Sequence, residues 1–224
     1  MSDLLATEVY ALHNKPIDEV IYFITRNDWN DCIIIDPFEW EGIKTWLATN
    51  KKRCSLVILT HEHYDHIGAV NQLKKEYRCT IVASEKCAEC VADFRLNFSA
   101  YYDVLMQLHG YKENIKTNPY TIEKIDITFN RQLDLYFHDT KIHLVETPGH
   151  SPGSICIEIG SALFTGDSLL RDTPAITKFP KGSKKDYNNI TYPYLITIDR
   201  QTMVYPGHGE SFFMKDNQFI NAGK

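Results

Sequence analysis

The chain has 224 residues, of which 43% are hydrophobic, and its formal net charge is -5. This length can bury a sizeable core, and the acidic balance gives no electrostatic reason to expect nucleic acid as a partner. No apolar run approaches the roughly 18 residues of a membrane span, and the N-terminus lacks a basic region followed by an apolar stretch. A cytoplasmic protein with no membrane segment is therefore expected.

Short apolar runs recur along the chain at the spacing of β-strands. Strands are predicted at residues 20–24, 32–35, 80–83, 154–159, 162–164 and 203–205, with further strand patterns between 120 and 145. Helices are predicted at residues 39–48 and 67–77. The stretch 85–120 has no clean period and is expected to form helices or an excursion over the site, and residues 171–191 are predicted to form a long loop. The whole chain, 1–224, is expected to be one domain.

The most informative motif is His61-Glu62-His63-Tyr64-Asp65-His66, which follows the apolar run 56–59. Any one of its three histidines could be a solvated loop residue. Together with Asp65, however, they place three imidazoles and a carboxylate at the end of one strand. Nitrogen and oxygen ligands of this kind suit a divalent cation. The cluster therefore predicts a metal site.

Three later polar loops also follow strand-like runs, and each carries one candidate ligand. They are Thr147–Gly153 with His150, Thr165–Asp167 with Asp167, and Pro206–Gly209 with His208. Loops that leave the same end of stacked sheets can meet in space, and their glycines and prolines allow tight turns. We therefore expect five histidines and two aspartates to share one cleft.

These four motifs, in this order, resemble the metallo-beta-lactamase superfamily, and within it the group related to hydroxyacylglutathione hydrolase, the second glyoxalase enzyme. The resemblance covers residues 20–210. It implies an α/β fold, a four-layer αββα sandwich with a dinuclear metal site at one edge of two packed sheets. It assigns His61, His63 and His150 to one ion, and Asp65, His66 and His208 to the other. It further implies that Asp167 bridges the ions and that Asp36, without binding metal, orients one of the ligands.

The resemblance implies a hydrolase with two divalent cations, zinc being expected and iron or manganese the alternatives. A hydroxide shared by the ions would attack an ester-like bond of a small molecule, first of all a thioester. Asp65 would be the catalytic residue, orienting the nucleophile and receiving its proton. Ser151 and Ser168 are expected to be turn residues, because neither lies in a nucleophile elbow.

Several alternatives remain open at this point. A lactonase would use the same ligands, with Tyr192 or Tyr194 near the carbonyl. A mononuclear iron persulfide dioxygenase would use His61, His150 and Asp167 alone. A phosphodiesterase would be expected to add a basic surface, and true beta-lactamases do not usually have an aspartate at the position of Asp167. Hydroxyacylglutathione hydrolases carry a helical C-terminal region that helps to bind glutathione. Glutathione specificity is not expected here, because only sixteen residues follow His208.

Two smaller groups of residues are interpreted as structural rather than functional. The pair Cys87 and Cys90 could be half of a zinc knuckle or a redox couple, but two thiols on a helix are preferred because no second pair follows. The lysines 181, 184 and 185 are expected to be a solvated face, with contact to a substrate anion as the alternative.

Overall fold

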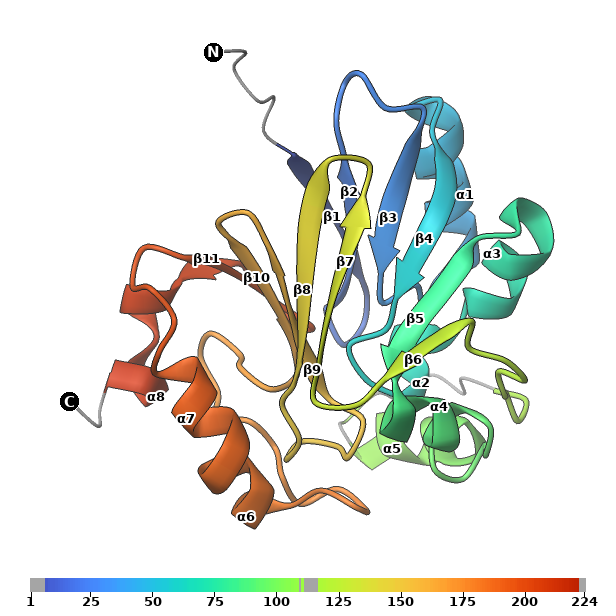
Figure 1. Cartoon of the computed structure of the whole chain (residues 1–224). Helices are drawn as coiled ribbons and strands as arrows, with labels where there is room; N and C mark the ends of the chain where they lie inside the picture. Colours follow the sequence, from blue (N-terminus) through green and yellow to red (C-terminus); the bar gives the residue numbers. More distant parts are fainter. Residues whose placement is uncertain (1–6, 109, 111–116, 222–224) are drawn as a thin grey trace.

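The computed structural model describes residues 7–108, 110 and 117–221, and within them the strands form two six-stranded sheets that face each other (Figure 1). The first sheet has the order β1-β2-β3-β4-β5-β6. The pairs β1–β2 and β2–β3 are antiparallel, and β3 to β6 run parallel to one another. Its strands are β1 (Glu8–Asn14), β2 (Glu19–Thr25), β3 (Asp31–Ile35), β4 (Arg53–Ile58), β5 (Thr80–Ser84) and β6 (Ile127–Phe129).

The second sheet has the order β12-β11-β10-β9-β8-β7. Strands β10 and β11 are parallel, and the other neighbouring pairs are antiparallel. Its strands are β7 (Gln132–Phe137), β8 (Thr140–Glu146), β9 (Ile155–Ile159), β10 (Ala162–Gly166), β11 (Met203–Pro206) and β12 (Phe212–Phe213). Both sheets are therefore mixed.

Helices cover the outer face of each sheet. In Figure 1, α1 and α3 lie beside the first sheet, α6 to α8 lie beside the second, and α4 and α5 lie below β5 and β6. The helical segments are α1 (Trp40–Thr49), α2 (Tyr64–Ile67), α3 (Val70–Tyr77), α4 (Glu85–Val91), η1 (Ser99–Tyr101), α5 (Tyr102–Leu108), α6 (Lys184–Asp186), η2 (Tyr187–Thr191), α7 (Tyr192–Leu195), η3 (Met214–Asp216) and α8 (Gln218–Asn221).

Strand β2 shows why the sheets lie inside the sandwich. Its side chains alternate between the two faces of the sheet, and all seven of its residues are buried. Ile21 and Phe23 pack with Ile43 and Leu47 of α1 on one side. On the other face, the alternate residues of β2 pack against Phe164 and other side chains of the second sheet. Each such aliphatic side chain contributes about 1.5–3 kcal/mol through the apolar surface it buries.

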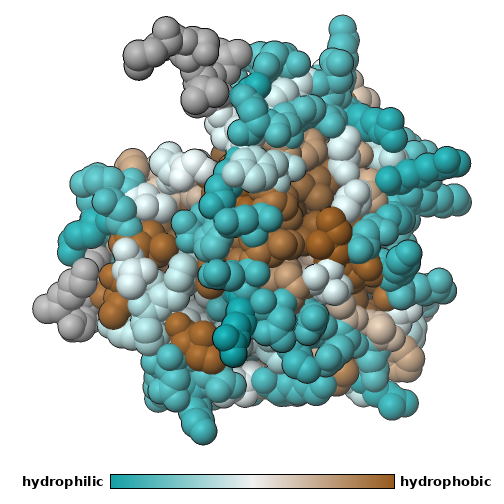
Figure 2. Space-filling model, viewed as in Figure 1, coloured by the Kyte–Doolittle hydropathy of each residue, from teal (hydrophilic) through white to brown (hydrophobic). Residues whose placement is uncertain are grey.

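A third apolar cluster joins the second sheet to the C-terminal helices, through Leu163 and Val204 of the sheet and Leu195 of α7. The three clusters separate four layers in the order α, β, β, α. Figure 2 shows the molecule from the same side as Figure 1, and hydrophobic residues are visible at the surface near its middle. The αββα sandwich expected from the sequence is confirmed.

The structure departs from the sequence predictions at several individual elements. Strand β1 is missing from the predicted elements, because its residues lie at the edge of the sheet and are only half-buried or exposed. The long loop predicted for residues 171–191 is wrong from residue 184, where α6 begins after Ser183, whose hydroxyl accepts a hydrogen bond from the Asp186 N–H. Within the stretch 85–120, residues 85–91 and 99–108 are helical and residues 92–98 form turns, whereas residues 109 and 111–116 lie outside the described part.

A membrane span would need a long apolar helix. In the part of the chain that the structure describes, no helix has the length and hydrophobicity for that role.

Candidate metal centre

The four polar loops meet at one edge of the sandwich, where β4, β8, β10 and β11 end. Leu59 and Thr60 lead from β4 to His61, and helix α2 carries Asp65 and His66. The hydrogen-bonded sheets fix the positions of the strand ends, so the loops that follow these strands begin at fixed positions. All seven predicted ligands lie in this small region, as the distances below show.

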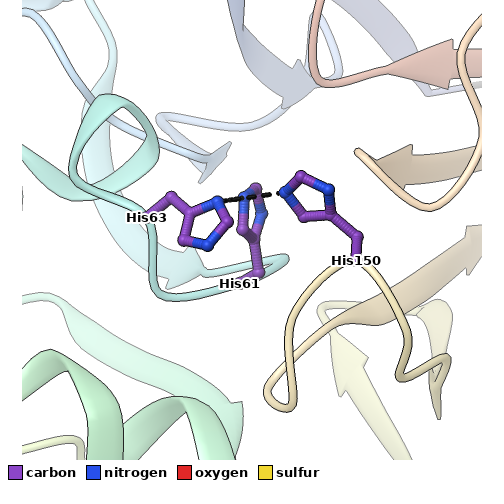
Figure 3. A group of neighbouring side chains, drawn as sticks. All are labelled: His61, His63 and His150. Carbon is purple, nitrogen blue, oxygen red and sulfur yellow. Dashed lines mark hydrogen bonds between the residues drawn. The ribbon is translucent and has the colours of Figure 1, made fainter. Parts of the chain in front are cut away.

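His61, His63 and His150 form the first cluster (Figure 3). His63 Nδ1 lies 3.1 Å from His61 Nε2 and 3.0 Å from His150 Nε2. All three rings are buried, and burial together with the positive charge of neighbouring histidines lowers the pKa of each. The imidazoles are therefore neutral at pH 7 and have lone pairs available, which is the state that binds a cation.

Asp65, His66 and His208 form the second cluster. His66 Nε2 lies 3.3 Å from His208 Nε2, and Asp65 Oδ2 lies 3.5 Å from His208 Nε2 and 3.9 Å from His66 Nε2. The α2 turn explains the pairing, because it carries Asp65 and His66 on consecutive residues while β11 delivers His208 from the other sheet. Two nitrogen atoms and a carboxylate oxygen thus converge in a second group.

Asp167 lies between the two clusters. Its Oδ2 atom is 3.5 Å from His150 Nε2 and 3.6 Å from His208 Nε2. Its Oδ1 atom is buried and has no hydrogen-bond partner among the described residues, and a Cβ at Gly207 would collide with it. A buried carboxylate oxygen without a partner is costly unless a cation compensates it. The donor set of the two clusters and Asp167 therefore fits bound divalent cations.

Main-chain carbonyls orient two of the histidines. His150 Nδ1 lies 2.8 Å from the carbonyl oxygen of Ile176, and His208 Nδ1 lies 3.1 Å from that of Ile17. A carbonyl can only accept, so Nδ1 carries the proton in each ring and donates it. When the ring is neutral, the lone pair is then on Nε2, the atom that faces the clusters. Such contacts around a metal site determine both the tautomer and the ring orientation.

Asp36 orients two further histidines. Its Oδ2 atom lies 3.0 Å from His66 Nδ1, and the same atom accepts a hydrogen bond of 2.5 Å from the Thr60 hydroxyl. The Thr60 oxygen in turn lies 3.0 Å from His61 Nδ1. Asp36, His61 and His66 also have ligand atoms within 4.8 Å of one another, but these hydrogen bonds already use Asp36 Oδ2. Asp36 thus contacts His66 directly and His61 through Thr60, on the side of each ring away from Nε2.

The electrostatics of the second cluster favour positive charge. Burial alone would lower the pKa of His66 and His208, but the neighbouring carboxylates Asp65 and Asp167 outweigh it. The pKa of His66 rises to about 10, with help from Asp36, and that of His208 to about 9. Burial opposes ionisation of Asp65 and Asp167 too, yet the surrounding histidines lower the pKa of both. Bound cations would take over the role of these protons.

A cavity of about 260 Å³ opens beside the ligands. Its polar floor contains His63, Asp65, Asp167 and His208. Its walls are mostly apolar, and they are formed by residues to which the sequence assigned no individual role: Ile17, Tyr64, Phe98, Tyr102, Leu105, Met106, Leu170, Ile176 and Phe179. Phe98 and Tyr102 come from the stretch 85–120, where aromatic residues without a clean helical period could have signalled this wall.

The tyrosines considered for a lactonase do not line this cavity. Tyr194 donates its hydroxyl hydrogen to Glu158 Oε1 at 2.7 Å, and Tyr192 lines a separate pocket near the C-terminus. Ser151 donates its hydroxyl hydrogen to Glu62 Oε2 and Ser168 to the Thr147 carbonyl, so each serine links its turn to another of the polar loops. The lysines 181, 184 and 185 are exposed, as expected for a solvated face.

Comparison with known proteins identifies the family. The protein-family model described as "Metallo-beta-lactamase superfamily" matches residues 15–208. The probable metallo-hydrolase YqgX of Bacillus subtilis is 27% identical over 198 residues, which cover 87% of this chain and 86% of that protein. A hydroxyacylglutathione hydrolase of Idiomarina loihiensis is 26% identical over 152 residues, which cover 68% of this chain but only 47% of that protein.

Solved structures share the fold. A B3 metallo-beta-lactamase, BLEG-1, is 25% identical with a TM-score of 0.81, covering 95% of this chain and 99% of that one. The protein TTHA1623 in a di-iron-bound form is 22% identical with a TM-score of 0.75, covering 94% of this chain and 100% of that one. Because the family model spans most of the sequence, from Lys15 between β1 and β2 to His208, this chain belongs to the metallo-beta-lactamase superfamily.

Proposed function

We propose that this protein is a dinuclear metal-dependent hydrolase that cleaves small ester-like substrates and prefers thioesters among them. The observation that carries the proposal is the position of Asp167, whose Oδ2 atom lies 3.5 Å from a histidine of one cluster and 3.6 Å from a histidine of the other. A single carboxylate between two nitrogen-rich groups is suited to a pair of cations rather than to one.

When bound, two divalent cations would supply a hydroxide nucleophile near neutral pH and polarise the substrate carbonyl. The residues of the chain do the rest. Asp65 lines the cavity, and its low pKa keeps its carboxylate ionised, so it can accept a hydrogen bond from the attacking water and orient it. The water oxygen bonds to the carbonyl carbon, the carbon–sulfur bond breaks, and a proton passes from the water through Asp65 to the leaving sulfur.

Zinc is the expected metal, with iron or manganese as alternatives. Imidazole and carboxylate ligands accept all three ions, and availability often decides among them. TTHA1623, which shares the fold, was found in a di-iron-bound form, so the iron alternative is worth testing directly. The thioester proposal draws support from the hydroxyacylglutathione hydrolase relative, which matches over about half of its own length.

A lactonase on the same ligands is the second candidate, although the absence of Tyr192 and Tyr194 from the described cavity lining removes the carbonyl contact considered for it. Separately, a persulfide dioxygenase would need only His61, His150 and Asp167. The assembled group of Asp65, His66 and His208 argues against that reading, because it would have no ion to bind.

The test is a substrate panel with protein reconstituted with zinc, manganese or ferrous iron. The panel contains an uncharged thioester, a lactone, a phosphodiester and a beta-lactam, and oxygen uptake is followed separately with a persulfide. We expect thioester hydrolysis to be fastest and oxygen uptake to be absent. Oxygen consumption with the persulfide, or no hydrolysis of any ester-like substrate in any metal form, would refute the proposal.

A further inference from the structure

The cavity beside the metal ligands is divided into a charged floor and an apolar wall. Carboxylates and imidazoles are confined to the floor, whereas Leu105, Met106, Leu170 and Ile176 contribute aliphatic side chains to the wall. Among the described residues that line the cavity, none is a lysine or an arginine. An acyl group that extends from the floor along the wall would therefore contact apolar surface and meet no cationic side chain.

Two phenylalanines stand over the first histidine cluster. The Phe98 ring centroid lies 4.7 Å from that of His63, and the Phe179 centroid lies 5.6 Å from His63 and 5.5 Å from His150. The two phenylalanine rings are 5.9 Å apart. They come from different segments, Phe98 from the stretch before α5 and Phe179 from the loop before α6. The reacting carbonyl and the group attached to it would thus lie beside these rings.

The backbone holds Phe98 in an unusual conformation. Its φ is +66°, in the left-handed region that bulky residues rarely adopt. The buried side chain of Asn97 stabilises this turn, because Nδ2 donates to the Tyr120 carbonyl at 2.7 Å and Oδ1 accepts from the Ser99 N–H at 2.9 Å. The Asn97 carbonyl also accepts from the Tyr64 N–H at 2.8 Å. The turn is thereby tied to the residue that follows His63, and strain of this kind is often found at ligand sites.

We propose that this cavity, which we call the acyl chamber, selects uncharged, apolar acyl groups and disfavours acyl groups that carry a carboxylate. The proposal rests on the proposed hydrolase function and names the substrate class of the same site. Each methylene that enters the chamber leaves water for apolar surface. A terminal carboxylate would instead lose its hydration without gaining a cationic partner from the chamber lining.

The experiment uses thioesters of one uncharged thiol, N-acetylcysteamine, with the metal-loaded protein. The acyl groups are acetyl, butanoyl, hexanoyl and adipoyl, the last being hexanoyl with a terminal carboxylate. We expect kcat/KM to rise by about four-fold per methylene, the factor that corresponds to ~0.8 kcal/mol, until the chain outgrows the chamber. We expect adipoyl to be at least about ten-fold poorer than hexanoyl. A flat or falling profile, or a preference for adipoyl, would overturn the proposal while leaving the hydrolase function standing.

Variants locate the effect in the chamber. Phe179→Ala should flatten the dependence on chain length, and so should Phe98→Ala, which is the second choice because its turn is strained. Phe213→Ala, at an exposed phenylalanine of β12 that is not part of the chamber lining, is the matched control and should keep the wild-type profile. If the Phe179→Ala profile matches the wild type, the assigned wall is wrong.

A binding measurement separates the chamber from the chemistry. Calorimetric titration with hexanamide, acetamide and hexanoate is carried out on the same protein, whether or not it hydrolyses any thioester. Tighter binding of hexanamide than of acetamide, weakened by Phe179→Ala, would support the acyl chamber even if the hydrolase proposal fails. Equal binding of the two amides would overturn it.

Discussion

Asp36 Oδ2 lies 3.0 Å from His66 Nδ1, and through the Thr60 hydroxyl it is also linked to His61. His61 belongs to the first cluster and His66 to the second. One carboxylate, buried at the end of β3, therefore orients an imidazole in each cluster. The two clusters share this support in addition to Asp167.

Replacing Asp36 should weaken metal binding at both clusters. Asn is the sharpest substitution, because Asp36 has a φ of +53° and asparagine tolerates that region. Its amide has a single accepting oxygen, whereas both carboxylate oxygens of Asp36 accept: Oδ1 from the Thr60 N–H, and Oδ2 from the Thr60 hydroxyl and His66 Nδ1. We expect Asp36→Asn to lower metal affinity by about 10–100-fold, measured by competition with a chromophoric chelator. Asp139→Asn, at an exposed carboxylate paired with Arg26, is the control, and equal affinities in the two variants would rule out the orienting role.

Asp167 and His63 should be needed for both metal content and hydrolysis. We expect Asp167→Asn and His63→Gln to reduce hydrolysis by at least about 100-fold, because each removes a ligand from the site that activates the nucleophile. Elemental analysis should show fewer bound ions, while the far-ultraviolet circular dichroism spectrum stays that of the wild type. His138→Gln, at a surface histidine that contacts Asp31, serves as the control. Full activity in either site variant would contradict the assigned roles.

Metal binding should release protons. In the metal-free protein the pKa of His66 is raised to about 10 and that of His208 to about 9, so both rings are protonated at pH 7.5. A histidine must be neutral to bind a cation. We expect these two rings to release about two protons per chain on loading, and the apparent affinity to rise with pH up to about 9–10. Calorimetry in buffers of different ionisation enthalpy measures the total number released, which should be smaller by about one in His208→Gln.

Glu62, between two of the ligands, should make stability depend on pH. It is buried, and desolvation raises its pKa from 4.5 to about 7 although Ser151 donates a hydrogen bond to Oε2. The folded state thus holds this proton more tightly than the unfolded chain. The resulting stabilisation is fully present below pH 4.5 and is lost as pH rises through about 7.

The variant Glu62→Gln isolates this effect, because glutamine keeps the size of the side chain and can still accept from Ser151. We expect the free energy of unfolding of the metal-free wild type, relative to the variant, to fall by on the order of 3 kcal/mol across that window. Urea unfolding at a series of pH values checks the slope. Parallel curves for the two proteins would show that Glu62 does not titrate in this range.

The candidate ligands can be recognised in the sequence because their signal is local. Three imidazoles and a carboxylate within the motif 61–66 directly follow an apolar run, and the later loops each place a histidine or aspartate after a strand. The two buried sheets were legible for the same reason, since continuous apolar runs such as residues 20–24 are typical of strands buried on both faces.

The residues around the ligands could not be predicted, because their roles depend on contacts between distant segments. The partners of His150 and His208 are main-chain carbonyls at Ile176 and Ile17, and every residue has a carbonyl. Phe98 lies in a stretch without a periodic pattern, and its orientation depends on a left-handed turn. Edge strand β1 was missed because its burial is partial.

The most direct test of the proposed dinuclear centre is anomalous diffraction from crystals grown with zinc, recorded on both sides of the zinc absorption edge. We expect two peaks, one among His61, His63 and His150 and the other among Asp65, His66 and His208, with Asp167 between them. A single peak bound only by His61, His150 and Asp167, or no peak at this edge of the sandwich, would contradict the assignment.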